Sequence, residues 1–252
     1  MNRKEIHHNR WIKAWRFADH LLPTTLIAAG IMASVLLTWN HPPLTTFLLA
    51  LLLVIQATHH PAPGDRTAML AAALLGTPAE IVEVHLGEWT YVAPALVFGV
   101  PMWISLIWAN LFALFRRLAR SWTALLDSGP GPVGPARTMI GGILILPIVS
   151  LWGAALILMD KPPLVRGLYA LMILITALFW NKEMDRLIFL TGAVLGALGE
   201  FVAVQLGYWS YYNPLFKAYG VDITLPLDWG LSAVIIHRIA SRWQHRTTEQ
   251  ES

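Results

Sequence analysis

Long runs of apolar residues, separated by short polar or Gly- and Pro-rich breaks, make up most of this sequence. Residues 21–39 and 92–115 contain no charged side chain. An uncharged apolar run of about 18 or more residues is long enough to cross the hydrocarbon core of a membrane as a helix. The pattern predicts eight transmembrane helices, over residues 21–39, 44–59, 66–86, 96–117, 138–159, 163–180, 185–207 and 223–241.

The composition supports a membrane protein. Of the 252 residues, 56% are hydrophobic and 13% are charged, whereas soluble domains carry about 25% charged residues. A charged side chain in the hydrocarbon core costs at least ~2.5 kcal/mol, so a chain that has lipid as its solvent is expected to be poor in charge. The predicted fold class is therefore an all-α polytopic membrane protein. The absence of cysteine excludes disulfides and thiolate metal sites.

The Lys and Arg residues predict the orientation in the membrane. If the N-terminus is cytoplasmic, fifteen of the eighteen fall in cytoplasmic segments, and only Lys161, Arg166 and Lys217 fall outside. Cytoplasmic loops of membrane proteins carry such an excess. We therefore expect an inner (plasma) membrane protein with a cytoplasmic N-terminal segment, 1–20, and a cytoplasmic tail, 242–252.

The chain contains an internal repeat. Residues 65–94 align with residues 185–214 without gaps, and 14 of the 30 aligned pairs are identical. Self-similarity at a fixed offset indicates a duplicated structural unit. We expect two four-helix repeats, 21–120 and 138–241, joined by a Gly- and Pro-rich cytoplasmic linker, 121–137. Because each unit has an even number of spans, the repeats would be parallel and related by a pseudo-twofold axis along the membrane normal.

Two glutamates occupy matching positions in the repeats. Glu80 and Glu200 each lie 14 residues after the Arg at the start of their predicted helix, which is about 21 Å along a helix that rises 1.5 Å per residue. Carboxyl groups at that depth are expected to face the bundle interior and are functional by default. They are our candidate catalytic acid and base, and they would share a proton if they met across the axis. The alternative is a structural hydrogen bond between the halves.

Three further polar residues lack an identical partner in the other repeat. Glu83 lies one turn after Glu80, on the same helix face. Asp228 lies inside the eighth predicted span, or at its interface if that span is shorter. These two are candidate assisting catalytic residues. His85, near the outer boundary, is a candidate binding residue, or it is simply solvated at the headgroup level.

Aromatic residues follow both glutamate helices in a repeated Gly-x-Trp-x-Tyr-x-x-Pro pattern, which favours a shared re-entrant turn. Trp89, Tyr91, Trp209 and Tyr211 either form an aromatic belt at the headgroups or line a cavity above the glutamates, where their faces would stabilise a cation. We treat them as candidate substrate-binding residues.

Other chemistries find little support in the sequence. It has no Gly-rich phosphate loop and no His-Glu-x-x-His motif, so no metal and no cofactor is expected. The basic residues serve as orientation signals, so nucleic acid is not an expected partner. The arginines near the cytoplasmic ends of the fourth and eighth spans are expected to be topology anchors facing anionic lipid. They are Arg116, Arg117, Arg120, Arg238, Arg242 and Arg246.

One segment resembles a known enzyme family. Glu80, Gly87-Glu88-Trp89-Thr90-Tyr91, Gly99-Val100-Pro101 and Trp108 follow in the order seen in the membrane carotenoid hydratases, and the pattern recurs in part from Glu200 to Gly220-Val221. More distantly, it is similar to the membrane lycopene cyclases and transmembrane terpene cyclases. The resemblance implies acid–base chemistry on an isoprenoid without a cofactor, and it adds Trp108 to the candidate binding residues.

Three functions remain open from the sequence. The leading hypothesis is a membrane enzyme that hydrates, cyclises or isomerises an isoprenoid, a carotenoid or a similar lipid, with Glu80 and Glu200 as acid and base. It predicts an apolar cavity at the level of the glutamates. A small proton-coupled transporter would instead have a polar cavity open to the outer water. A scaffold or assembly factor that binds another membrane protein would need no cavity. The sequence leaves the oligomeric state undetermined.

Overall fold

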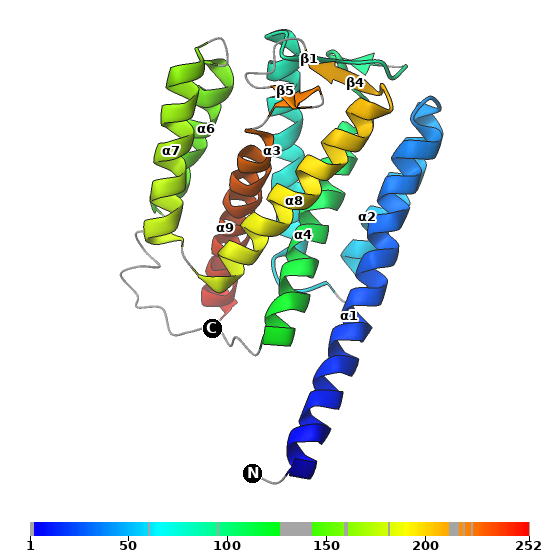
Figure 1. Cartoon of the computed structure of the whole chain (residues 1–252), viewed down its shortest axis with the longest axis vertical. Helices are drawn as coiled ribbons and strands as arrows, with labels where there is room; N and C mark the ends of the chain where they lie inside the picture. Colours follow the sequence, from blue (N-terminus) through cyan, green and yellow to red (C-terminus); the bar gives the residue numbers. More distant parts are fainter. Residues whose placement is uncertain are drawn as a thin grey trace.

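The computed structural model describes residues 3–59, 61–94, 96–126, 143–158, 161–180, 182–211, 217–218, 220–222 and 224–251. Over these residues the chain is mostly helical (Figure 1). The helices are α1 (Arg3–Thr38), α2 (Pro42–Thr58), α3 (Asp65–His85), α4 (Ile104–Leu126), α6 (Ile145–Ile157), α7 (Pro162–Phe179), α8 (Glu183–Gln205) and α9 (Leu225–Glu251).

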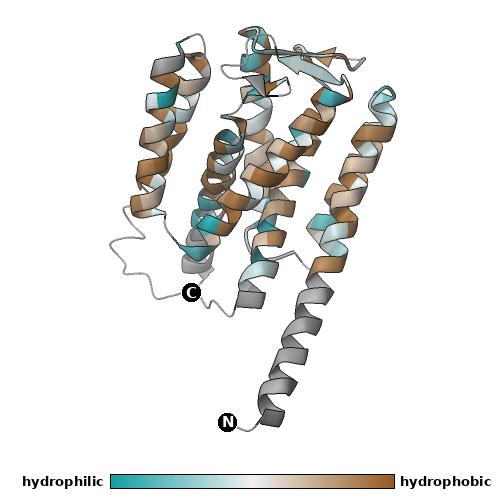
Figure 2. Cartoon of the chain, in the orientation of Figure 1, coloured by the Kyte–Doolittle hydropathy of each residue, from teal (hydrophilic) through white to brown (hydrophobic). Residues whose placement is uncertain are grey.

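Three of these helices contain segments long and apolar enough to cross a membrane: Leu21–Thr38 of α1, and all of α3 and α8. Helices α2, α6 and α7 also contain apolar segments, which are shorter. Hydrophobic residues make up much of the helices (Figure 2), and large side chains such as Leu37, Leu74 and Leu146 are more than half exposed. A soluble protein rarely leaves so much contiguous apolar surface in water. The chain is an integral membrane protein.

Four helices form the centre of the bundle. Helix α3 packs on α4, α8 packs on α9, and both α4·α8 and α3·α9 are also in contact. The α1–α2 hairpin packs against α4 on one side, while the α6–α7 hairpin lies on the other side against α3 and α9 (Figure 1). A helical hairpin thus covers the central helices on each of two sides.

Glycines allow the central helices to approach a tryptophan closely. A Cβ on Gly76 of α3 would lie 2.0 Å from the ring of Trp108 on α4, and one on Gly196 of α8 would lie 2.3 Å from Trp229 on α9. The two indoles stack on each other with centroids 5.1 Å apart. The repeated glycine therefore has a packing reason, because any larger residue would displace a core indole.

Short strands join the helices at the end of the bundle opposite the two chain termini (Figure 1). Strand β1 (Trp89–Tyr91) pairs antiparallel with β4 (Trp209–Tyr211). Two hairpins complete this layer: β2 (Leu96–Val97) with β3 (Val100–Pro101), and β5 (Lys217–Ala218) with β6 (Val221–Asp222).

The same turn leads from each glutamate helix into its strand. Gly87 and Gly207 adopt left-handed backbone angles, with φ of 77° and 74°. The next amide bonds back to the helix in both cases, from Glu88 to the Glu83 carbonyl and from Tyr208 to the Ala203 carbonyl, each at 3.0 Å. This is the Schellman arrangement, in which glycine is favoured because it has no Cβ to clash. It places the aromatic strand directly over the end of its own helix.

The structure departs from the sequence expectations in three places. The predicted all-α class contains no strands, whereas short strands stand where re-entrant turns were expected. The predicted span 96–117 is wrong at its start, because residues 96–101 form a hairpin and the helix begins at Ile104. Helix α4 continues to Leu126, while most of the expected linker, and the start of the predicted span 138–159, lie outside the described residues.

Candidate functional site

Glu80 is held by one tyrosine and one tryptophan. The Tyr91 hydroxyl donates to Oε2 at 2.5 Å, and the Trp108 indole donates to Oε1 at 3.1 Å. The glutamate is only 5% exposed. Its donors come from strand β1 and helix α4, so this side chain ties three elements of the first half together.

Glu200 is held in a similar way in the second half. Trp209 donates to its Oε2 at 2.7 Å and Tyr211 donates to the same oxygen at 3.1 Å. Both donors belong to strand β4. The β1–β4 register places Tyr91 opposite Trp209, with ring centroids 5.4 Å apart. The four predicted aromatic residues therefore come together beside the two glutamates.

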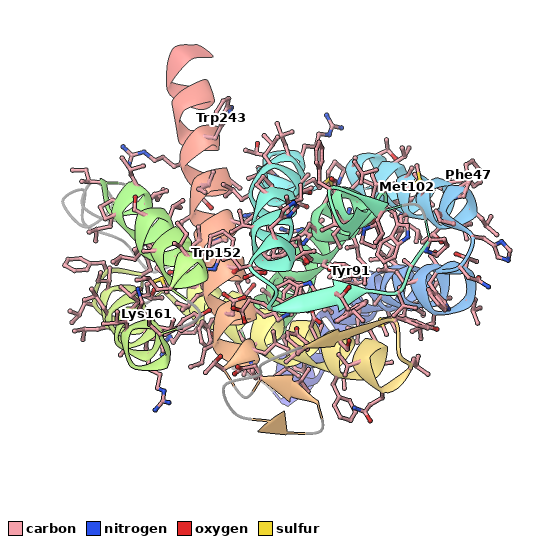
Figure 3. The ribbon with its side chains drawn as sticks, turned by 90° about the horizontal axis from the view of Figure 1, so that it is seen from above. Phe47, Tyr91, Met102, Trp152, Lys161 and Trp243 are labelled. Carbon is pink, nitrogen blue, oxygen red and sulfur yellow. The ribbon has the colours of Figure 1, made fainter. Side chains whose placement is uncertain are left out.

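Asp228 forms a third site of the same kind. The Trp152 indole and the Tyr169 hydroxyl donate to its Oδ1 at 2.9 and 3.0 Å. Trp152 lies on α6 and Tyr169 on α7, so these two bonds fasten the α6–α7 hairpin to α9. Viewed from above, Trp152 lies on the side of α6 that faces α9, and the strand carrying Tyr91 crosses the middle of the bundle (Figure 3). Neither donor to Asp228 was singled out from the sequence.

Two cavities flank these carboxylates. The acidic cavity is lined by Glu80, Glu83, Glu88, Glu200, Asp222 and Asp228, together with aromatic rings. The apolar cavity lies among α1, α4 and α8, and aliphatic residues such as Ile31, Val35 and Leu195 line it. Glu80, Glu200 and the stacked indoles of Trp108 and Trp229 border both cavities. The wall between the cavities is thus the predicted glutamate pair with the central indoles.

The other predicted site residues take different positions. Glu83 is buried and lines the acidic cavity. The indole nitrogen of Trp89 is buried, without a hydrogen-bond partner among the described residues. His85 is exposed and its Nδ1 lies 2.8 Å from the Ile81 carbonyl of its own helix, so the structure does not bring it to either cavity. Within the described ranges no hydrogen bond joins Glu80 to Glu200 directly; aromatic donors bind each of them instead.

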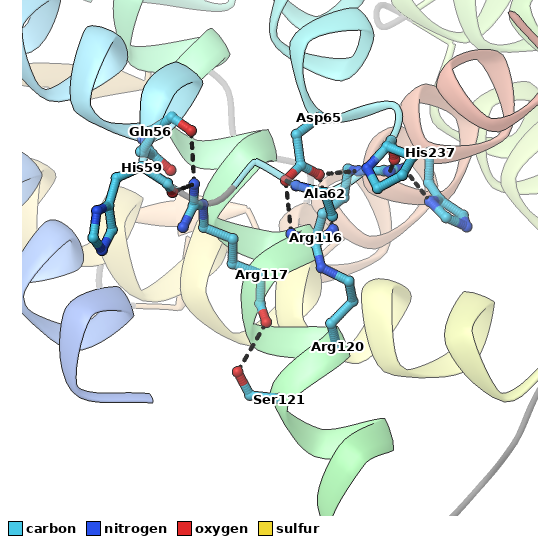
Figure 4. Close-up of polar contacts among 10 residues, drawn as sticks. Gln56, His59, Ala62, Asp65, Arg116, Arg117, Arg120, Ser121 and His237 are labelled. Atoms are coloured by element: carbon cyan, nitrogen blue, oxygen red, sulfur yellow. Dashed lines mark hydrogen bonds and ion pairs between the residues drawn. The ribbon is translucent and has the colours of Figure 1, made fainter. Parts of the chain in front are cut away.

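A second polar cluster lies nearer the other end of the bundle (Figure 4). Asp65, which is fully buried, accepts bonds from Arg116 at 3.0 Å and from both terminal nitrogens of Arg120 at 2.8 and 2.7 Å. Arg116 also donates to Nδ1 of His237 at 2.5 Å. Arg238 forms an ion pair with Asp185. A chain of polar contacts therefore joins α3 and α4 to α8 and α9.

The arginines of this cluster correct an expectation from the sequence. Arg116 and Arg117 are 6% and 8% exposed, and Arg117 donates to the carbonyls of Gln56 and His59 at 2.6 and 2.9 Å. They are not anchors facing lipid. The aspartates at the starts of α3 and α8 are buried and need a counter-charge, and the arginines of the neighbouring helices supply it.

Two solved structures are similar to this chain. No model of a known protein family and no curated protein matches the sequence. The crystal structure of the mycobacterial Insig homologue MvINS from Mycobacterium vanbaalenii matches with a TM-score of 0.54 and 20% identity, covering 70% of this chain and 92% of that one. A cross-linked MvINS trimer matches equally well, covering 73% and 95%. The chain shares the fold of an Insig homologue.

This finding overturns the leading sequence hypothesis. The predicted isoprenoid enzyme is wrong, because the likeness is to an Insig homologue and not to a hydratase or a cyclase. Both oxygens of Glu80 accept hydrogen bonds from the protein, so this side chain has a structural role. A carboxylate fixed by two side chains on other elements is suited to hold the structure and to bind. The motif resemblance to the hydratases itself remains an untested prediction.

Proposed function

We propose that this protein is a membrane scaffold that holds a lipid-like molecule in the apolar cavity without converting it. The observation that carries the proposal is an apolar cavity with one polar corner inside the fold of an Insig homologue. This differs from the simple scaffold considered from the sequence, which needed no cavity. A ligand-dependent scaffold accounts for both the cavity and the fold.

The lining indicates the kind of ligand. Aliphatic side chains from α1, α4 and α8 form most of the wall, and Glu80, Glu200 and Tyr91 are its ionisable groups. Pockets of this composition bind largely apolar molecules and orient them with a few polar contacts. The ligand would place an alkyl or ring portion against α1 and one hydrogen-bonding group toward the glutamates.

The same features favour a scaffold over a transporter. A transporter needs a polar path that opens alternately to each side. Here the polar contacts through Asp65, Arg116 and His237 link the two central helix pairs at one end, and the β1–β4 ribbon links them at the other. Helices fastened at both ends are poorly suited to rocking past one another.

A cavity-filling variant tests the proposal. Gly199 lines the apolar cavity, and a Cβ added there would meet no atom within 4 Å. Gly199→Leu should therefore fold while its side chain occupies the ligand space. Gly153→Leu on α6 is the matched control, because it also has open space and lies outside the residues that line the cavity.

The measurement is mass spectrometry of lipids extracted from each purified variant, after equal washing in detergent. We expect one enriched lipid class in the wild type and in Gly153→Leu, and a loss of at least about tenfold in Gly199→Leu. Equal lipid content in all three proteins would refute binding in this cavity.

We further propose the finer arrangement in the membrane. All eight helices would lie in the bilayer as two parallel four-helix repeats about a pseudo-twofold axis, with both termini cytoplasmic at the inner membrane. The matched Gly–Trp contacts of Gly76 and Gly196 support this arrangement, as do the two termini at one end of the bundle (Figure 1). Fluorescent-protein fusions at either terminus should be fluorescent, and a periplasm-dependent phosphatase fused after Lys161 should be active. The opposite pattern would refute the orientation.

Self-association is a further part of the proposal. MvINS has been obtained as a cross-linked trimer, and this chain exposes apolar helix faces on which copies could pack. Light scattering of the detergent-purified protein should give a protein mass of two or more 28.1 kDa chains. A strictly monomeric mass at every concentration would refute it.

A further inference from the structure

We propose that the acidic cavity binds the ammonium group of an organic cation. This site lies on the other side of the Glu80–Glu200 wall from the apolar cavity and does not depend on the function proposed there. It stands on the charge, the unpaired carboxylate, the aromatic walls and the size of the cavity.

The charged side chains that line the cavity are all acidic. Six carboxylate side chains line it, and none of the described lining residues is basic. Burial disfavours a charge on Glu83, and the neighbouring side chains of Asp228, Glu80, Glu200 and Glu88 disfavour it further unless a cation is bound. The N-terminus of α9, which carries Asp228 in its first turn, supplies only about half a positive charge. A cation bound in the cavity would pair with Glu83 and offset this repulsion.

Glu83 is the member of the group without a partner. Its side chain is 7% exposed, and no hydrogen bond or ion pair reaches it from the described residues. By contrast, Glu80, Glu200 and Asp228 each accept bonds from one tryptophan and one tyrosine. A buried carboxyl group keeps its charge only when it is paired, and otherwise becomes neutral. An unpaired carboxylate that lines a cavity therefore points to a ligand that pairs with it.

The walls select an organic cation over a metal ion. Six aromatic rings line the cavity: Trp89, Trp108, Trp152, Tyr169, Tyr211 and Trp229. Aromatic faces attract ammonium groups, and cages of such rings are a common way to bind them. In the part of the chain that the structure describes, no three acidic or histidine side chains are placed to coordinate one metal ion.

The size fits a small cationic group. The space open to the centre of a water molecule is about 40 Å³, and one water needs roughly 10–15 Å³ measured in this way. A group of a few heavy atoms fits, such as a protonated primary amine or a small quaternary ammonium. The group could belong to a free amine or to the headgroup of a phospholipid, and the experiment distinguishes them.

The test is calorimetric titration of the detergent-purified protein with tetramethylammonium chloride and with ethylammonium chloride, against sodium chloride at equal ionic strength. At least one organic cation should bind saturably, and sodium should not compete. Glu83→Gln removes one charge and keeps the shape, and it should weaken binding at least about tenfold, as expected for loss of a charged hydrogen bond. Glu183→Gln is the matched control and should bind like the wild type, because Glu183 lies at the start of α8 and does not line the cavity.

A second variant guards against a folding defect. Glu83→Ala copies Ala203, the residue at the equivalent position of the second half, which is buried there; it should fold and lose binding. Repeating the titration in nanodiscs with and without phosphatidylethanolamine separates the sources. Weaker apparent binding with that lipid identifies its headgroup as the ligand, and equal binding identifies a free amine. Absence of saturable binding, equal competition by sodium, or unchanged affinity in both Glu83 variants would overturn the proposal.

Discussion

Replacing Gly76 by alanine should destabilise the bundle sharply for so small a change. The new Cβ would lie 2.0, 2.3 and 2.5 Å from three atoms of the Trp108 ring. Carbon atoms in contact stay about 3.5–4.0 Å apart, so the indole or the helix would have to move by roughly 1.5 Å. The ring has little freedom to move, because Trp108 is 6% exposed, stacks on Trp229 and donates to Glu80.

The magnitude follows from opposing effects. Overpacking of a core costs about 1–3 kcal/mol, and a lost hydrogen bond between Trp108 and Glu80 would add about 1 kcal/mol. Alanine has a higher helix propensity than glycine, which offsets about 1 kcal/mol of this loss of stability. The net loss for Gly76→Ala is therefore about 1–3 kcal/mol. Gly199→Ala gains the same helix propensity without a clash, so the free energies of unfolding of the two variants should differ by about 2–4 kcal/mol.

The assay is unfolding of the purified protein in mixed micelles by titration with a denaturing detergent, followed by circular dichroism. Gly196→Ala, against Trp229 at 2.3 Å, should behave like Gly76→Ala. If Gly76→Ala proves as stable as Gly199→Ala, the close packing of helix against indole is not what holds the centre together.

Three further substitutions can be checked in the same assay. Asp65→Ala leaves buried arginines without their counter-charge and should cost about 3–5 kcal/mol; a loss below 1 kcal/mol would show that the cluster is solvated. Tyr169→Phe removes one of two donors to Asp228 and should cost about 0.5–1.5 kcal/mol, while a neutral effect would mean that this bond does not fasten the hairpin. Gly87→Ala forces a Cβ into a left-handed turn at φ 77° and should cost about 1 kcal/mol, although no atom lies within 4 Å of that Cβ; an unchanged midpoint would argue against strain there.

Much of the helical framework could be predicted from the sequence. The apolar runs give the approximate positions of the helices because a bilayer requires long uncharged segments, whatever the neighbouring helices are. The repeat marks Gly76, Glu80, Trp89 and Tyr91 as residues with equivalents, and the structure gives each a contact within the central bundle. These properties are local or come from comparing the chain with itself.

Contacts between segments that are distant in the sequence could not be predicted in this way. Three-residue strands such as Trp89–Tyr91 exist because a partner strand more than a hundred residues away completes their hydrogen bonds. Trp, Thr and Tyr favour strands, but the propensity of three residues does not predict a strand without its partner. Trp152 is one of several aromatic residues in apolar helices, and only the fold shows that it faces Asp228. The arginines follow the positive-inside pattern whether they face lipid or a buried aspartate, so their charge alone misled.

The apolar cavity is proposed to hold its ligand without changing it. The direct measurement is to isolate the lipid that copurifies with the protein, return it to delipidated protein at a slight excess over the sites, and follow its mass and chromatographic position for several hours. We expect saturable rebinding and full recovery of the same molecule. A new product that forms with the wild type and not with Glu80→Gln would contradict it.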